Sequence, residues 1–375
     1  MASPTGHVLI SPDKFKGSLS ASEAAASLAA GLARHRPGVP LVTLPVADGG
    51  DGTVEAAVAA GFERRTARVA GPTGEPVEAC YAVRGDTAVV ELAEASGLHL
   101  LPGGRLQPLT ASSLGAGLLL LAAARGGARR IVLGLGGSAC TDGGAGLVQA
   151  LGARLLDAGG NRLPPGGAAL RRLHTLDLRG FNDLGNVEIV VASDVDNPLL
   201  GREGAAAVYG PQKGADREGV KTLEAGLRRW ADLVEAASRR PARDRPGAGA
   251  AGGVGFAALA LLGARVEPGI AYLLDLLGFT GRLAGARLVI TGEGSLDAQT
   301  LRGKAPVGVA RAAARAGVPV VAVCGRRSLT GEQLRRARIS AAYPLTDLEP
   351  DVERCISAAG PLLERLTFAI AEEWL

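Results

Sequence analysis

The feature that most constrains the fold is an alternation of short apolar runs and helical stretches near the N-terminus. Residues 8–10 form a short apolar run, and Ser20 and Glu23 have the spacing of a capping box that begins a helix. A second apolar run at 41–46 leads into a helical stretch at 53–60. Strands that alternate with helices along the chain predict a parallel sheet covered by helices.

The same alternation returns near the C-terminus, after a middle part with a different pattern. Strands are predicted at 287–291, 318–324 and 339–343, and helices at 306–316 and 330–336. From about residue 66, short strands separated by Gly and Pro predict a mixed sheet instead. We therefore expect an α/β protein in which residues 1–65 and 285–375 form one Rossmann-like, doubly wound parallel-sheet domain. Residues 66–284 form an inserted second α/β domain with a mixed sheet, and the cleft between the domains is the expected site.

Composition agrees with two packed α/β domains. The 375 residues exceed the length of a typical single domain. Hydrophobic residues make up 47% and aromatic residues only 3%, so the core must consist mainly of Ala, Val and Leu. The 55 glycines follow no fixed short period and gather at the ends of apolar runs, which indicates loops rather than a fibrous or disordered chain.

Charge and cysteine spacing argue against several classes of partner. The net charge is only +4, and Lys and Arg are scattered without interleaved aromatic residues, so no nucleic-acid partner is expected. The four cysteines have no CxxC spacing, which favours reduced thiols over zinc or disulfides. Without a basic and apolar leader or a membrane-length apolar run, we expect a cytoplasmic protein with no membrane partner. The sequence does not indicate whether the protein forms oligomers.

The loop after the first predicted strand combines cations with a helix N-terminus. It contains Lys14, Lys16 and Ser18 and ends at the capped helix. The free N–H groups and the dipole of that helix favour an anion, such as a phosphate or a carboxylate. A solvated basic loop with an ordinary helix cap is the alternative.

Two carboxylates flank glycines in the next loop. Asp48 and Asp51 lie three residues apart, between glycines that allow close approach of the backbone. Carboxylate oxygens suit Mg²⁺, which usually takes one or two carboxylates together with substrate phosphates. Asp51 is alternatively the N-cap of the following helix.

A third glycine-rich loop follows the strand predicted at 130–135. Its backbone N–H donors at Gly136, Gly137 and Ser138 can cradle a phosphate. The loop also loosely matches a dinucleotide fingerprint, and Asp157 lies about 20 residues further on, so an NAD-dependent oxidoreductase is one alternative. Against it, the loop continues where a dinucleotide-binding helix should begin.

Further polar residues follow later strands or lie in turns. Asp194 and Asp196 alternate at a strand exit, so one of them is expected to point into the cleft. Lys213 lies in a tight turn. The last candidate loop combines acids with a later cation, at Glu293, Ser295, Asp297 and Lys304. The glycine spacing there does not match a Walker A motif, and the HRD and DFG motifs of protein kinases are missing.

Seven segments together resemble the bacterial glycerate kinase family. In chain order they are SPDKFKGSLSA, ADGGDGT, GLGGSACTDGGAG, ASDVDNPL, YGPQKGA, GAAGGVGFA and TGEGSLDAQTLRGK. They span Ser11 to Lys304, so the resemblance covers nearly the whole chain. Seven long motifs in order are far more specific than any single glycine pattern.

The resemblance implies an ATP-dependent phosphotransferase that acts on glycerate, with Mg²⁺ as cofactor and the reaction in the cleft. Such a reaction requires cations and N–H donors for phosphates, carboxylates for the metal, and a base for the hydroxyl proton. We expect Asp194 as the base, with Lys16 and Asp48 also catalytic. The metal ligands are expected among Asp48, Asp51 and Asp297. Binding of substrate or phosphate is expected at Lys14, Ser18, Gly136, Gly137, Ser138, Lys213, Glu293, Ser295 and Lys304.

The acceptor hydroxyl and one alternative function are also considered in the expectation. We favour phosphorylation of the 2-hydroxyl of D-glycerate over the 3-hydroxyl. A noncatalytic sensor that binds a sugar acid is the alternative from another functional class. Acidic residues beside the anion loops argue against the sensor, because a pure binder of anions would gain by omitting carboxylates.

Overall fold

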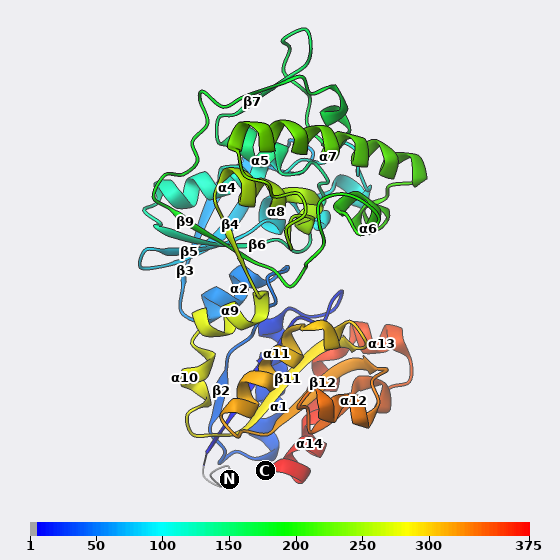
Figure 1. Cartoon of the computed structure of the whole chain (residues 1–375). Coiled ribbons are helices and arrows are strands. Elements are labelled where there is room, and N and C mark those ends of the chain that lie inside the picture. Colours follow the sequence, from blue (N-terminus) through cyan, green and yellow to red (C-terminus); the bar gives the residue numbers. More distant parts are fainter. Residues whose placement is uncertain (1–5) are drawn as a thin grey trace. The chain divides into compact units, whose positions relative to one another are not determined.

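The computed structural model describes residues 6–375, which divide into two compact units (Figure 1). Unit 1 comprises the described residues up to Asp48, Glu55–Gly61 and Ile270–Leu375. Unit 2 comprises Gly49–Val54 and Phe62–Gly269. Unit 1 is therefore assembled from segments that are far apart in the sequence.

Unit 1 is built on a parallel five-stranded sheet with the order β13-β12-β11-β1-β2. Its strands are β1 (His7–Pro12), β2 (Leu41–Thr43), β11 (Ala286–Leu296), β12 (Val320–Arg327) and β13 (Ala341–Pro344). Numbered in chain order within the unit, these strands have the doubly wound order 2-1-3-4-5. The order reverses between β1 and β11, and the crevice outside the carboxyl ends of such a strand pair is where ligands bind in open α/β sheets.

The helices of unit 1 alternate with its strands as predicted. They are α1 (Ala21–His35), α10 (Phe279–Leu283), α11 (Ala305–Arg315), α12 (Gly331–Arg336), α13 (Val352–Ser357) and α14 (Ala359–Trp374), with short 3₁₀ turns at η5 (Thr300–Arg302) and η6 (Leu345–Asp347). The predicted capping box is present, because Ser20 and Glu23 each accept the backbone N–H of the other. Helix α1 buries Leu28 and Leu32 in a core that it shares with α14.

Unit 2 contains a mixed sheet of six strands in the order β10-β9-β6-β5-β4-β3. Strands β3 (Glu63–Ala70), β4 (Pro76–Arg84) and β5 (Thr87–Glu91) pair antiparallel. Strand β5 pairs parallel with β6 (Arg130–Gly134), β6 pairs parallel with β9 (Glu188–Ala192), and β9 pairs parallel with β10 (Arg265–Glu267). A separate antiparallel pair consists of β7 (Arg154–Leu156) and β8 (Thr175–Asp177).

Helices pack over the unit 2 sheet around a core rich in Ala, Val and Leu (Figure 1). They are α3 (Ala93–Ser96), α4 (Leu114–Arg125), α5 (Ala145–Ala150), α6 (Ala205–Tyr209), α7 (Arg217–Ser238) and α8 (Ala250–Leu261), and the 3₁₀ turns are η1 (Leu98–Leu100), η2 (Pro102–Gly104), η3 (Gly167–Arg172) and η4 (Pro211–Lys213). Trp230 of α7 is fully buried and donates from its ring N–H to Gly143 O at 2.8 Å. The parallel sheet of unit 1 and the mixed sheet of unit 2 confirm the predicted α/β fold class.

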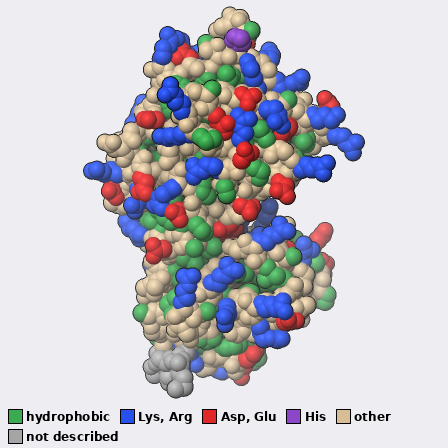
Figure 2. Space-filling model, viewed as in Figure 1, with side chains coloured by type: hydrophobic (Ala, Val, Ile, Leu, Met, Phe, Trp, Pro, Cys, Tyr) green, Lys and Arg blue, Asp and Glu red, His purple; other side chains and the backbone are tan. Residues whose placement is uncertain are grey.

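Two helices contain residues of both units. Helix α2 (Thr53–Ala59) begins in unit 2 and continues in unit 1, and α9 (Gly269–Leu276) does the same. Within residues 6–375, no helix combines the length and the apolarity that crossing a bilayer requires. On the face shown in Figure 2, Lys and Arg side chains are interspersed with Asp and Glu rather than gathered in one patch.

Candidate active site

Three carboxylates gather in unit 1, where the strand order of the sheet reverses. Asp13 follows β1 directly, Glu293 lies in β11, and both are almost fully buried at 8% and 6% exposure. Burial, and then the neighbouring Asp48 carboxylate, raises the pKa of Asp13 well above its ordinary range. Burial also raises the pKa of Glu293, with a further contribution from Asp48. We call Asp13, Asp48 and Glu293 the carboxylate cluster.

Several donors and cations partly offset the negative charge of the carboxylate cluster. The Lys14 N–H donates to Asp13 Oδ1 at 2.7 Å, and the Lys14 charge also lowers the pKa of Asp13. The Thr300 hydroxyl donates to Glu293 Oε1 at 2.5 Å. The Lys304 ammonium lies 3.8 Å from Glu293 Oε2. Carboxylates with lysines beside them are suited to hold a divalent cation next to a phosphate.

The backbone around the carboxylate cluster is fixed by the sheet and by one glycine. The Asp13 N–H donates to Gly292 O at 2.8 Å, which extends the pairing of β1 with β11 by one residue. A Cβ on Gly292 would lie 2.4 Å from Val323 O, so a larger residue cannot be accommodated there without moving β12. The position of Asp13 therefore follows from the packing of neighbouring strands.

The other predicted residues of unit 1 have different surroundings. Lys16 is exposed, whereas the Ser18 hydroxyl donates to Ile356 O of α13 at 2.5 Å. Asp297 accepts the Gln299 N–H at 2.8 Å and the Ser295 hydroxyl at 3.3 Å. Ser18 and Asp297 thus each have protein partners that order their loops.

In unit 2, the two glycine loops predicted from the sequence are packed against each other. The Gly136 N–H donates to Gly49 O at 3.1 Å. A Cβ on Gly136 would lie 2.3 Å from the Gly50 Cα, and a Cβ on Gly137 would lie 1.5 Å from Asp51 Oδ1. Glycine is therefore required at both positions for the loops to approach this closely.

Glu91 organises the same region and was not among the predicted residues. It ends β5, is 3% exposed, and accepts the N–H groups of Gly52 and Val54 at 3.1 Å. Burial raises the pKa of Glu91 to about 8, although the donated N–H groups lower it. Glu91 thereby fixes the first turn of α2 and the loop that carries Asp51. The only sequence signal for Glu91 was an acid at the end of an apolar run, which alone is weak evidence of a functional residue.

Lys213 is buried rather than available at a surface. It is 2% exposed, and its ammonium donates to Ser138 Oγ at 2.8 Å and to Cys140 O at 2.5 Å. Burial lowers the pKa of Lys213, and the Cys140 thiol and the Asp142 carboxylate offset part of this effect. The structure thus brings two predicted residues, Lys213 and Ser138, into direct contact.

Asp142, in the glycine-rich loop after β6, bonds the N-termini of two helices. It is fully buried and accepts the N–H and the hydroxyl of Ser113 at 2.8 and 2.9 Å. It also accepts the N–H groups of Gly144 and Gly146 at 3.1 and 3.2 Å. These donors lie at the starts of α4 and α5, so the carboxylate stabilises both helices.

The GAAGGVGFA segment packs tightly on this loop. Gly252 O accepts the Gly143 N–H at 2.9 Å, and a Cβ on Gly252 would lie 2.2 Å from Cys140 O. Ala251, Gly252 and Gly253 all have left-handed backbone conformations. The glycines of this motif are therefore explained by close packing within unit 2.

Asp194 and Asp196 both have exposed side chains after β9. Asp194 Oδ1 accepts the Gly269 N–H at 3.0 Å, at the start of α9. The structure thus gives Asp194 a backbone partner. Its role as a general base stays a prediction.

The donor chemistry of the carboxylate cluster fits Mg²⁺. Among residues 6–375, no three or more His, Cys, Asp or Glu side chains form a preformed metal cage. Magnesium does not require such a cage, because one or two carboxylates and phosphate oxygens are its usual protein-site ligands. The predicted ligands Asp48 and Asp297 belong to unit 1 and Asp51 to unit 2. Buried carboxylates with raised pKa values would be stabilised by a nearby cation.

Comparisons with known proteins agree across nearly the whole chain. Residues 8–375 match the sequence profile described as the glycerate kinase family. Glycerate kinase of Bacillus subtilis is 44% identical over 368 residues, which are 97% of this chain and 96% of that protein. Glycerate 2-kinase of Escherichia coli is 46% identical over 330 residues, which are 87% of this chain and 86% of that protein.

A solved structure agrees as well. A protein of Salmonella typhimurium LT2 that is assigned as a glycerate kinase 2 superposes with a TM-score of 0.82 at 40% sequence identity. The match covers 98% of each chain. The seven motifs, the fold and the relatives lead to the same result: the chain belongs to the glycerate kinase family.

Proposed function

We propose that the protein transfers the γ-phosphoryl group of ATP to the 2-hydroxyl of D-glycerate, with Mg²⁺ as cofactor. Membership of the glycerate kinase family supports the reaction, and the Escherichia coli relative named glycerate 2-kinase supports the choice of hydroxyl. The observation that carries the proposal is the carboxylate cluster at the strand-order reversal of unit 1.

The carboxylate cluster supplies the metal-binding part of this function. Asp13 and Asp48 are the proposed ligands, and bound Mg²⁺ would neutralise charge on the phosphates of ATP. Lys14 lies beside Asp13 and Lys304 beside Glu293 of the carboxylate cluster, where cations stabilise the negative charge of a transferred phosphoryl group. We propose Lys16, which is exposed, as a contact to the phosphates or to the glycerate carboxylate.

The glycine loops of unit 2 supply N–H donors and a fixed backbone. We propose that the N–H groups of Gly137 and Ser138 cradle a phosphate or carboxylate, while Gly136 holds this loop against Gly49. Glu91 and Lys213 are positioning residues in this proposal, because each bonds the backbone or side chain of a loop from a buried position. Asp194 is the proposed base for the hydroxyl proton. That the reaction takes place between the two units stays a prediction.

Product analysis tests the function directly. The protein is incubated with ATP and D-glycerate, with and without Mg²⁺, and ³¹P and ¹³C NMR identify the product. We expect Mg²⁺-dependent formation of ADP and 2-phosphoglycerate. Formation of 3-phosphoglycerate would overturn the choice of hydroxyl. Saturable glycerate binding without ADP release would support a noncatalytic sensor instead.

A further inference from the structure

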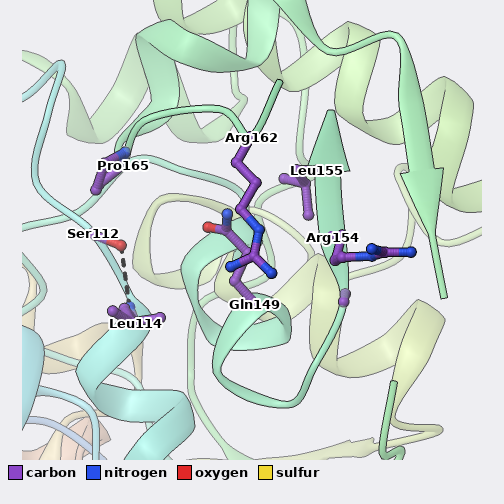
Figure 3. Close-up of a pocket in the computed structure, with 8 residues that line it drawn as sticks. Ser112, Leu114, Gln149, Arg154, Leu155, Arg162 and Pro165 are labelled. Atoms are coloured by element: carbon purple, nitrogen blue, oxygen red, sulfur yellow. Dashed lines mark hydrogen bonds between the residues drawn. The ribbon is translucent and has the colours of Figure 1, made fainter. Parts of the chain in front are cut away.

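A pocket in unit 2 is lined by none of the residues predicted from the sequence to act in the reaction. It has a volume of about 210 Å³, and its polar lining consists of Ser112, Gln149, Arg154 and Arg162 (Figure 3). Leu114 and Leu155 contribute apolar walls. The lining residues come from the start of α4, from α5 and from the β7 region, and all belong to unit 2.

The charge of this pocket is positive and is not neutralised by its own lining. No acidic residue lines it. Arg154 is paired with Asp177, with 3.0 Å between Nε and Oδ2, and its guanidinium points away from Arg162 in Figure 3. Within residues 6–375, by contrast, the exposed Arg162 guanidinium has neither an ion pair nor a hydrogen bond. The pocket therefore presents one unpaired cation.

The nearby acids already have other partners. Asp177 accepts the Arg179 side chain as well as that of Arg154. Asp157 accepts the N–H groups of Gly159 and Asn161, both at 2.9 Å, in the turn that precedes Arg162. Among the described residues, neither carboxylate forms an ion pair with Arg162, although both lie in its part of the chain.

The backbone of Arg162 and the side chain of Ser112 are held in place. Arg162 pairs with Leu156 through an isolated antiparallel bridge, which fixes its backbone beside β7. Ser112 is 4% exposed, and its hydroxyl accepts the Leu114 N–H at 3.2 Å and lies 3.5 Å from Asp142 Oδ2. Figure 3 shows Arg162 and Gln149 reaching into the middle of the pocket. A guanidinium and an amide are suited to donate to oxygen atoms of one anion.

We propose that this pocket binds a small oxyanion, either a phosphate ester or a carboxylate, with Arg162 as its main contact. Its volume of about 210 Å³ suits a small ligand. The guanidinium forms paired hydrogen bonds to a phosphate or carboxylate, while the Gln149 amide adds a donor. The apolar walls face the carbon atoms of the ligand.

The test locates binding through hydrogen exchange, which needs no enzymatic activity. The full chain is titrated separately with 2-phosphoglycerate, inorganic phosphate and D-glycerate, and exchange is measured in peptides covering residues 149–163. We expect saturable protection of this segment in the wild type by at least one of the three anions. The three arms distinguish a phosphate ester, free phosphate and a carboxylate as the ligand.

Matched variants make the result specific. Arg162→Ala should raise the anion concentration that gives half-maximal protection of residues 149–163 about tenfold or more, because one charge-assisted paired contact is lost. Arg202→Ala removes another exposed arginine of unit 2 outside the pocket and should leave the protection unchanged. Protection that is equal in Arg162→Ala and in the wild type would overturn the proposal, and so would its absence with all three anions. Neither outcome would affect the proposed kinase reaction, which NMR tests separately.

Discussion

The chain contains two Asp-Gly-Gly tripeptides, at Asp48 and at Asp142, and the structure puts them in opposite environments. Asp142 is fully buried and accepts four hydrogen bonds of 2.8 to 3.2 Å from backbone and hydroxyl donors. Asp48 is half-buried beside two other carboxylates whose pKa values it helps to raise. The first arrangement satisfies a carboxylate within the protein, and the second favours an added cation.

Local sequence alone therefore does not distinguish these two aspartates. Both tripeptides come after an apolar run and before a helix. What differs is the tertiary environment, because donors surround Asp142 whereas Asp48 lies beside two other carboxylates. The predictions below test whether Asp48 serves a ligand and Asp142 serves the fold.

The largest effect is expected for Asp48→Asn. Loss of one carboxylate should lower kcat/KM for ATP and glycerate by roughly 10²-fold or more, because the charge that holds the metal is reduced. The melting temperature should stay the same or rise, since repulsion within the carboxylate cluster falls. Glu218→Gln, at an exposed acid of α7, is the matched control and should retain activity. Normal turnover of Asp48→Asn would remove it from the proposed site.

The opposite pattern is expected for Asp142→Asn. The amide presents one acceptor oxygen in place of two to a fully buried set of donors, so the free energy of unfolding should fall by about 3 kcal/mol. Urea denaturation monitored by circular dichroism measures this change. Asp244→Asn, at an exposed aspartate of the same unit, should alter stability by less than about 0.5 kcal/mol. Equal stability of the two variants would contradict a structural role for Asp142.

Glu91 predicts a pH dependence of stability. Its pKa is about 8 in the folded chain against an ordinary value of 4.5, so folding takes up a proton between these pH values. The free energy of unfolding should therefore fall as the pH rises from about 5 to about 8, by a contribution on the order of a few kcal/mol. Comparison of pH-stability curves for the wild type and Glu91→Gln isolates this contribution. Parallel curves would show that Glu91 titrates normally.

The smallest effect is expected at Lys213. Lys213→Met keeps most of the length of the side chain but removes the donor to Ser138 and Cys140, and kcat/KM should fall roughly tenfold as the loop loosens. If Lys213 acts through Ser138, adding Ser138→Ala should change kcat/KM little further. Fully additive losses would instead indicate that Lys213 contacts a ligand itself. Lys221→Met, at an exposed lysine of α7, is the control.

Much of the fold was accessible from the sequence because its signals are local. The capping box at Ser20 and Glu23, the parallel sheet of unit 1 and the mixed sheet of unit 2 follow from apolar periodicity and short-range spacing. Strand order was not accessible, since it depends on which strands pair across long separations in the chain. The reversal between β1 and β11 could only be seen in the structure.

The site was accessible only in part, because burial and long-range contacts decide what each residue does. The motifs drew attention to the lysines of the first loop, whereas the structure shows the adjacent Asp13 as the more deeply buried charged group. Glu91 was missed because its partners, Gly52 and Val54, are far from it in the sequence. The role of Lys213 in binding stays a prediction, and its burial could not be read from a turn sequence.

Binding of Mn²⁺ to the ATP complex tests whether the carboxylate cluster of unit 1 holds the metal. Mn²⁺ replaces Mg²⁺ so that electron paramagnetic resonance reports the bound metal. We expect the ATP complex of the wild type to bind Mn²⁺, and we expect Asp48→Asn to weaken this binding about tenfold or more. Glu218→Gln should bind Mn²⁺ as the wild type does. Equal Mn²⁺ affinity in the Asp48→Asn and wild-type complexes would contradict the claim that the carboxylate cluster of unit 1 holds the metal.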